Sequence, residues 1–122
     1  MSQPPGCLND LVGIVLSNHG GRQLDAARSG LENLVNIVEA LETREPWPNP
    51  QFAVFVDGGV RCASNILKAI ASGASAVGVG RAFMYSFCAY GQDGVEKAFQ
   101  IFRVGLMALV FVCARFLVSM TD

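Results

Sequence analysis

The chain has 122 residues, of which 52% are apolar, and its formal net charge is −1. This length suits one domain, and the near-neutral charge gives no electrostatic case for nucleic-acid binding. Residues 1–6 lack the basic and apolar regions of a signal peptide, and four widely spaced cysteines with a single histidine form no recognisable zinc site.

The spacing of the cysteines indicates the cellular compartment of the protein. No two of the cysteines have the C-x-x-C spacing, so we expect reduced thiols in an intracellular protein. Residues 1–10 are expected to be irregular. The cysteines are Cys7, Cys62, Cys88 and Cys113.

The first apolar segments predict a strand followed by a helix. Residues 12–16 form an apolar run with the length of a buried strand. Ser29 and Glu32 have the spacing of a capping box, which predicts a helix to about Glu42. A proline-rich stretch, residues 45–50, then breaks the helix. The apolar face of this helix is expected to consist of Leu31, Leu34, Val35, Val38 and Leu41.

A second strand and helix follow. Residues 52–56 predict another buried strand. Residues 63–72 predict a short helix, with Gly73 as its stop signal. The side chains expected to face inward are Ile66, Leu67 and Ile70.

A third unit has weaker boundaries. Residues 74–81 predict a strand of small residues with Arg81 at its end. Asp93 and Glu96 resemble the start of another helix. The inner face of that helix is expected to consist of Val95, Ala98, Phe99 and Phe102.

The order of these elements predicts the fold class. Strands that alternate with helices indicate a parallel sheet with helical crossovers. The first two strands lack polar alternation, so we expect both of their faces to be covered.

One segment at the end of the first strand carries the clearest chemical signal, Ser17-Asn18-His19-Gly20-Gly21-Arg22-Gln23-Leu24-Asp25. The only histidine stands three positions before an arginine, across two glycines that allow close backbone approach to a ligand. A base beside a fixed cation suits a substrate that loses a proton and carries a carboxylate. His19 is equally compatible with a structural role, and Arg22 with a solvated surface charge.

Two further strand ends have the composition of a phosphate site. Residues 57–61 and 78–81 combine glycines with Arg61 and Arg81. Glycine amides can point at an anion, and the arginines add charge-assisted contacts. Each cluster alone could be a tight turn, but together they favour a phosphate site like that of eight-stranded barrels.

These three motifs together resemble the FMN-dependent 2-hydroxy acid dehydrogenases and oxidases, the family of flavocytochrome L-lactate dehydrogenases and glycolate oxidase. The similarity covers residues 11–103. It implies an α/β fold in which this chain is the C-terminal part, about three βα units, of an (α/β)8 TIM barrel. It also implies oxidation of a small L-2-hydroxy acid to a 2-oxo acid, an intracellular location that includes mitochondria or peroxisomes, and a possible homo-oligomer.

The resemblance assigns roles to individual residues. His19 would be the catalytic base and would bind the substrate together with Arg22. The residues implied to contact FMN are Ser17, Asp57, Gly58, Gly59, Arg61, Gly80 and Arg81. No metal site is implied.

The resemblance is incomplete at both ends. The family's flavin-contacting lysine and tyrosine, and the aspartate that orients the histidine, lie on earlier strands and have no counterpart here. We therefore expect the chain alone to be weakly active or inactive. Residues 104–122 form an apolar tail, expected to be helical, where the family has a charged amphipathic helix.

Several alternatives stay open. The tail is either an aberrant terminus or a membrane helix through residues 104–120, and Arg115 disfavours the membrane helix because an arginine is costly inside a bilayer. The whole chain could instead be a non-catalytic fragment that pairs with the rest of a barrel. It could also belong to another phosphate-binding TIM barrel, which would leave the His19–Arg22 motif unexplained.

Overall fold

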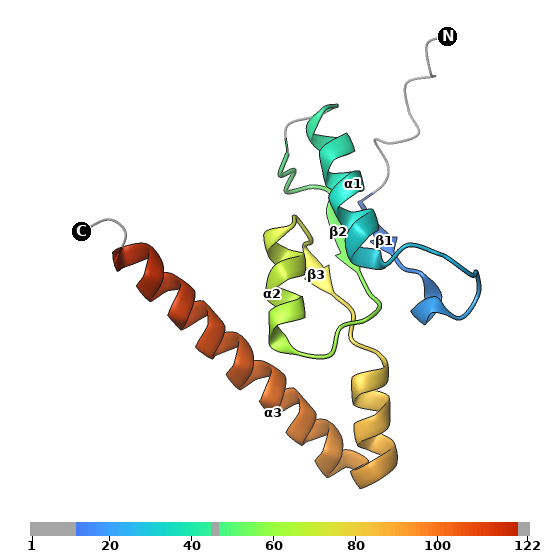
Figure 1. Cartoon of the computed structure of the whole chain (residues 1–122), viewed down its shortest axis with the longest axis vertical. Coiled ribbons are helices and arrows are strands. Elements are labelled where there is room, and N and C mark those ends of the chain that lie inside the picture. The colour runs from blue at the N-terminus through green and yellow to red at the C-terminus, as the bar shows by residue number, and fades with distance from the viewer. Residues whose placement is uncertain (1–11, 45–46, 120–122) are drawn as a thin grey trace.

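The computed structural model describes residues 12–44 and 47–119, and of residues 117–119 only the backbone (Figure 1). The expected irregular start at residues 1–10 therefore lies outside the described residues. The elements in chain order are β1 (Gly13–Leu16), the 3-10 turn η1 (His19–Gly21), α1 (Gly30–Glu42), β2 (Ala53–Val56), α2 (Ala63–Ala71), β3 (Ala76–Val77) and α3 (Arg81–Ser119).

The three strands form a parallel sheet in the order β1-β2-β3. Gly13 is opposite Ala53 and Leu16 is opposite Val56, so β1 and β2 pair along their whole length. Because α1 and α2 are the crossovers between parallel strands, the strand–helix alternation expected from the sequence is confirmed.

The start of α1 is fixed by its own side chains. The Oγ of Ser29 accepts a hydrogen bond from the amide of Glu32 at 3.2 Å, and the Glu32 carboxylate accepts from the Ser29 amide at 2.8 Å. This is the capping box that the sequence predicts, and it satisfies amides that would otherwise lack a partner. The helix ends at Glu42, as expected.

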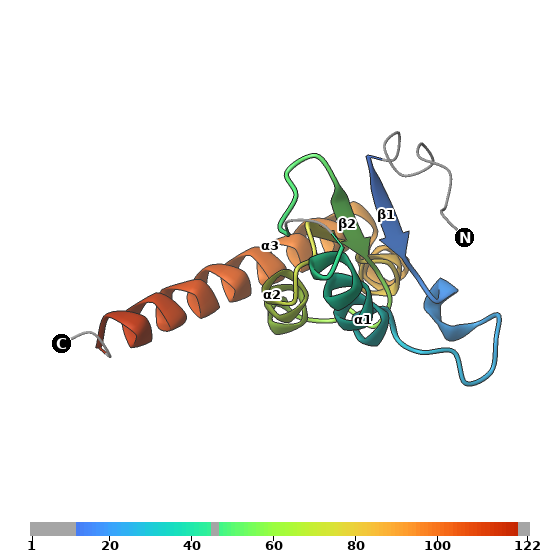
Figure 2. The same ribbon diagram turned by 90° about the horizontal axis from the view of Figure 1, so that it is seen from above.

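The core lies between the sheet and the helices on one side of it (Figure 2). Leu34 and Val54 are fully buried there, and Val56 and Ala69 are nearly so. Side chains alternate along a strand, so residues 14, 16, 54 and 56 face the helices.

The opposite face of the sheet is open. Val15 is 68% exposed and its neighbour Phe55 is 42% exposed. The expectation that both faces of these strands are covered was therefore wrong for the described residues. The apolar pattern predicts which side chains favour burial, but it does not show whether residues of the same chain bury them.

The third strand is shorter than expected. Only Ala76 and Val77 pair with β2, so the expectation of a strand over residues 74–81 was wrong. The Gly78 amide still donates to the Val56 carbonyl at 2.8 Å, but the strand ends at Val77, and Arg81 begins α3 instead of closing the strand. The amides of Phe83 and Met84 both donate to the Gly80 carbonyl, which starts the helix at once.

Helix α3 is bent at Gly91, where φ is +59° and ψ is −140°, a conformation available to glycine. A second helical arm begins after this kink, as the Asp93 and Glu96 pattern predicts, whereas the first arm, from Arg81, was not expected. The two arms pack closely: a Cβ at Gly94 would collide with the Ser86 carbonyl, and the Phe83 and Phe102 rings stack 5.6 Å apart.

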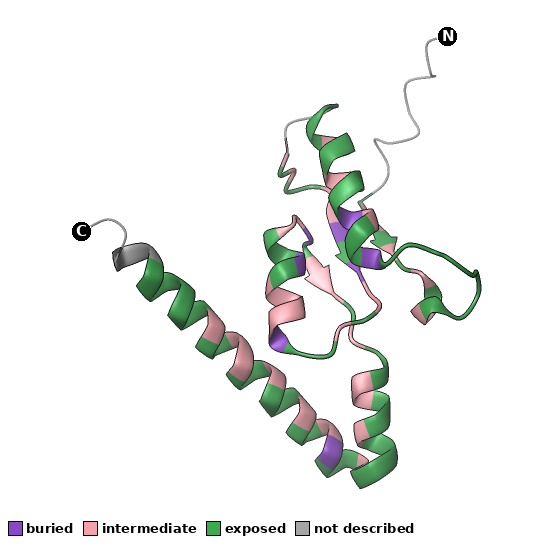
Figure 3. Cartoon of the chain, viewed as in Figure 1, coloured by how far each residue is buried: buried purple, intermediate pink, exposed green. Residues whose placement is uncertain are grey.

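Some side chains expected to face inward lie at the surface (Figure 3). Ile70 of α2 is 43% exposed and Phe99 of α3 is 61% exposed, and Leu31 and Val35 of α1 are also exposed. Helical periodicity predicts an apolar face but not how wide the covered stripe is.

The apolar tail is helical as far as Ser119, as expected. Among the described residues one helix, Arg81–Phe116, is long and apolar enough to cross a membrane by length and composition alone. The core helix of a soluble protein passes the same criterion, so this is weak support for a membrane segment.

Candidate functional site

The carboxyl ends of the three strands meet at one rim of the sheet. A hollow of about 410 Å³ lies at this rim. Its lining contains all the site residues predicted from the sequence except Ser17. The lining residues are His19, Gly20, Arg22, Asp57, Gly58, Gly59, Arg61, Gly80, Arg81 and Met84. Parallel pairing explains the meeting, because each strand delivers its C-terminal loop to the same edge.

The histidine sits in an unusual turn. His19 has φ +55°, which is uncommon for a residue with a side chain, and Gly20 and Gly21 continue in the same left-handed region. The His19 amide donates to Ser17 Oγ at 3.1 Å, and the Gly21 amide donates to the Asn18 carbonyl at 3.0 Å. These local bonds hold the imidazole at the mouth of the hollow.

The imidazole and the neighbouring guanidinium are in contact. Arg22 Nη2 lies 3.3 Å from His19 Nε2. A guanidinium can only donate, so Nε2 is the acceptor in this contact. The single lone pair of Nε2 is engaged by Arg22 here, so the imidazole can act as a base on a substrate when the guanidinium turns to a carboxylate instead.

Besides Arg22, two further arginines supply positive charge to the hollow. Arg61 follows β2 and Arg81 follows β3, and both line it. Gly58 and Gly59 have φ +90° and +76°, and no atom lies within 4 Å of where a Cβ would stand at Gly59 or Gly80. This leaves open space beside two guanidinium groups, which fits a phosphate.

Asp57 is enclosed by glycines. A Cβ at Gly30 would collide with the Asp57 carbonyl, and one at Gly78 would lie 3.0 Å from Asp57 Cβ. Asp57 Oδ1 and Asn18 Oδ1 are buried and have no hydrogen-bond partner among the described residues. Unpaired buried acceptors are costly, so this end of the hollow fits a ligand that brings hydroxyl donors, as the ribityl chain of FMN does.

The sequence left some contributors unassigned. Met84 lines the hollow one turn into α3, and it was missed because Arg81 was assigned to a strand instead of a helix start. Asn18 was quoted in the motif without a role. Ser17 lies instead in a neighbouring hollow of about 360 Å³ that shares His19.

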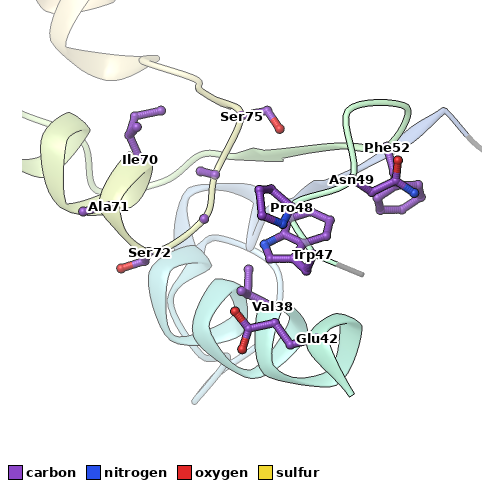
Figure 4. Close-up of a pocket in the computed structure, with 12 residues that line it drawn as sticks. Val38, Glu42, Trp47, Pro48, Asn49, Phe52, Ile70, Ala71, Ser72 and Ser75 are labelled. Carbon is purple, nitrogen blue, oxygen red and sulfur yellow. The ribbon is translucent and has the colours of Figure 1, made fainter. Parts of the chain in front are cut away.

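A larger hollow, about 600 Å³, lies at the other end of the sheet (Figure 4). Trp47 and Pro48 form one wall, and Ile70 and the turn after α2 form another. Among the described residues of its lining, Glu42 alone is charged. None of the predicted site residues is there, and the amino ends of barrel strands usually serve stability.

No group of three His, Cys, Asp or Glu side chains that could hold a metal ion occurs in the part of the chain that the structure describes. Cys62 is an exposed free thiol at the start of α2. Hydrogen bonding with the Ser64 hydroxyl and with Asn65 lowers the pKa of this thiol. Cys62 does not belong to the lining of the hollow, so its thiol has no part in the candidate site.

Comparisons with known proteins show which family and which solved structures the chain resembles. The sequence pattern of the family described as FMN-dependent dehydrogenase matches residues 9–114. The L-lactate dehydrogenase (cytochrome) of Saccharomyces cerevisiae is 50% identical over 91 residues, which are 75% of this chain and 15% of the relative. A peroxisomal (S)-2-hydroxyacid oxidase of Arabidopsis thaliana is 41% identical over 91 residues, 75% of this chain and 23% of the relative.

Solved structures give the same picture. A double mutant of flavocytochrome b2 with pyruvate bound superposes with a TM-score of 0.71 at 49% identity. The superposition covers 77% of this chain and 23% of the flavocytochrome chain. The chain thus spans less than a quarter of the length of these three relatives.

Proposed function

The chain belongs to the FMN-dependent dehydrogenase family, and from that premise we propose that it supplies the phosphate grip and the catalytic base of a barrel that oxidises a small L-2-hydroxy acid to a 2-oxo acid. In this proposal β1, β2 and β3 are the last three strands of an (α/β)8 barrel. The open face that bears Val15 and Phe55 would then be the barrel interior, and earlier strands would cover it.

The proposed cofactor contacts come from two strand ends. Arg61 and Arg81 would hold the FMN phosphate, with Gly58, Gly59 and Gly80 leaving room for it. Asp57 would accept from the ribityl hydroxyls, and Ser17 would lie by the flavin ring. FMN, when bound, accepts the two electrons that leave the substrate.

One observation carries the choice of substrate, the 3.3 Å contact between Arg22 Nη2 and His19 Nε2. In this proposal the Arg22 guanidinium turns to the substrate carboxylate, which it binds through parallel hydrogen bonds, and Nε2, released from Arg22, accepts a proton from the substrate. A 2-hydroxy acid suits this pair, because its hydroxyl-bearing carbon is bonded directly to its carboxylate. Flavocytochrome b2 with pyruvate, a 2-oxo acid, supports the assignment by analogy.

A second candidate is that the chain is a non-catalytic portion that acts only together with the rest of a barrel. The open sheet face and the share of the relatives that it spans favour this alternative for the isolated chain. We expect the chain alone to oxidise no hydroxy acid even with FMN added. Anaerobic flavin bleaching by L-lactate or glycolate measures this directly, and clear bleaching would contradict the alternative.

The catalytic proposal is tested in a chimera, the flavin domain of yeast flavocytochrome b2 with its matching segment replaced by residues 12–103 of this chain. His19→Gln should retain FMN but lower kcat about 10²–10⁴-fold, the usual contribution of a positioned general base. Arg22→Lys should raise KM and lower kcat, because lysine cannot reproduce a bidentate grip on a carboxylate.

Arg44→Lys is the control for the chimera, because Arg44 lies just beyond α1, at the end of the sheet away from the site. The kcat and KM of this variant should equal those of the parent chimera. A His19→Gln chimera with full turnover would rule out His19 as the base.

A further inference from the structure

A hydrogen bond joins Arg81 to the turn that carries His19. Arg81 Nη2 donates to the carbonyl oxygen of Gly20 at 2.8 Å, across 61 positions of the chain. The donor is charged, which makes such a bond stronger than one between neutral groups. Because Gly20 directly follows His19, a side chain at the start of α3 holds the peptide next to the histidine.

This bond is distinctive among those of η1. The His19 amide is bonded to Ser17, two residues away, and the Gly21 amide is bonded to Asn18, three residues away. In the described part of the chain, Arg81 alone ties the turn to a distant element by a hydrogen bond. This side chain therefore ties the turn to the start of α3.

The absence of a side chain at Gly20 allows the guanidinium of Arg81 to approach its carbonyl closely. Its φ is +68°, and a Cβ there would lie 3.2 Å from Arg81 Nη2. A side chain at this position would be strained and would also crowd the arginine. The glycine thus serves the contact with Arg81 as well as the turn.

Arg81 has hydrogen-bond donors that its bond to Gly20 does not use. A guanidinium has five N–H groups in a planar fork, and the bond to Gly20 uses one nitrogen. The same side chain lines the hollow together with Arg61. A planar fork can hold an anion on one edge and a carbonyl on another, whereas a lysine ammonium offers only a compact point charge.

We propose that Arg81 is a positioning residue for His19, whose guanidinium binds the cofactor phosphate and at the same time fixes the Gly20 carbonyl, so that occupancy of the phosphate site sets the placement of the base. This inference rests on the function proposed above. A bound anion restricts the rotamers of Arg81, and the restriction reaches the left-handed turn at His19 through the Gly20 peptide.

The test uses NMR spectra of the full chain during titration with inorganic phosphate and then with FMN. The Gly21 amide reports the hydrogen bond, because its peptide group contains the Gly20 carbonyl, and the chain has a single imidazole, that of His19. Both signals should shift in step with phosphate binding. Arg81→Lys keeps the charge and should weaken phosphate binding about tenfold. At saturation it should leave the Gly21 shift at a third of the native value or less.

Arg44→Lys is the matched control, because it makes the same substitution away from the hollow and should titrate like the native chain. In the chimera with saturating FMN, Arg81→Lys should lower kcat about tenfold or more through misplacement of the base, while KM stays near the parent value because Arg22 is intact.

The outcomes separate the two claims. Two results would overturn the positioning role. One is a phosphate-saturated Arg81→Lys variant in which the Gly21 amide signal shifts as far as in the native chain. The other is a native chain whose Gly21 and His19 signals do not change on addition of phosphate. A parent chimera that binds FMN but oxidises no hydroxy acid would overturn the proposed function, and the phosphate titration would still decide whether Arg81 couples the two sites.

Discussion

At the scale of single residues, the missing Cβ atoms of glycines shape the site. Gly30 lets the start of α1 approach the end of β2, because any larger residue would meet the Asp57 carbonyl and would lie 2.9 Å from Val56 Cγ2. Both obstacles are fixed, one being backbone and the other a core side chain. The position of Asp57 in the hollow therefore depends on a glycine in another element.

We expect Gly30→Ala to destabilise the protein by about 1–3 kcal/mol, the usual cost of overpacking, although alanine favours helices. The measurement is urea unfolding followed by circular dichroism. Gly80→Ala is the matched control: no atom lies within 4 Å of its Cβ position, and its stability should change by less than about 0.5 kcal/mol. Equal losses in the two variants would refute the steric explanation.

At the scale of the elements, α1 shows how a local signal fixes a boundary. The Glu32 carboxylate accepts hydrogen bonds from the amide and hydroxyl of Ser29, and these bonds hold the pKa of Glu32 below its usual value. The ionised form therefore favours the folded state. Its contribution is complete above the pKa of an unfolded glutamate, about 4.3, and is lost as pH falls through the lower folded pKa.

We expect Glu32→Gln to lower stability at pH 7 and to match the native chain once the pH has fallen below the folded pKa of Glu32. Urea midpoints at pH 7 and pH 3 measure the gap in stability between the native chain and Glu32→Gln. Ser29→Ala removes the donor hydroxyl and the N-cap, so it should cost about 1 kcal/mol at pH 7 and shrink the effect of Glu32→Gln. A gap that is the same at both pH values would contradict the capping role.

The elements also mark what sequence alone could predict. The strands at 13–16 and 53–56 and the helices at 30–42 and 63–71 followed from apolar periodicity and a capping pattern, which are local signals. The helix from Arg81 was missed because two glycines and an arginine resembled a strand end, and nothing local marks where pairing with β2 stops. The meeting of His19, Asp57 and Arg81 in one hollow could be expected from parallel order. The Arg81–Gly20 bond could not, because it depends on side-chain geometry across 61 positions.

At the scale of the whole molecule, only one of the two faces of the sheet is covered by the described helices. The helices cover residues 14, 16, 54 and 56, whereas Val15 and Phe55 meet solvent. The outer edges of β1 and β3 have no partner strand among the described residues. An apolar face of this kind attracts other apolar groups, and a free edge offers unpaired backbone N–H and C=O groups to other strands.

We therefore expect the chain alone to bind the dye ANS, and the chimera to bind much less because its other strands cover the open face. Replacing Val15 and Phe55 by serine should reduce dye binding by the chain, whereas replacing the already polar Gln100 by serine should not. Dye fluorescence at equal protein concentrations makes the comparison. A chain that leaves the dye dark would show that the face is covered.

The parallel register has one more consequence. Every residue that lines the hollow lies between His19 and Met84, so the residues proposed to hold the phosphate, to act as the base and to bind the carboxylate fall in one uninterrupted stretch of sequence. Such a stretch is portable: one exchange of coding sequence would carry all three into another barrel. The recipient would then set the size and shape of the acid, while the donor would keep the chemistry, so that selectivity and reactivity could be exchanged separately.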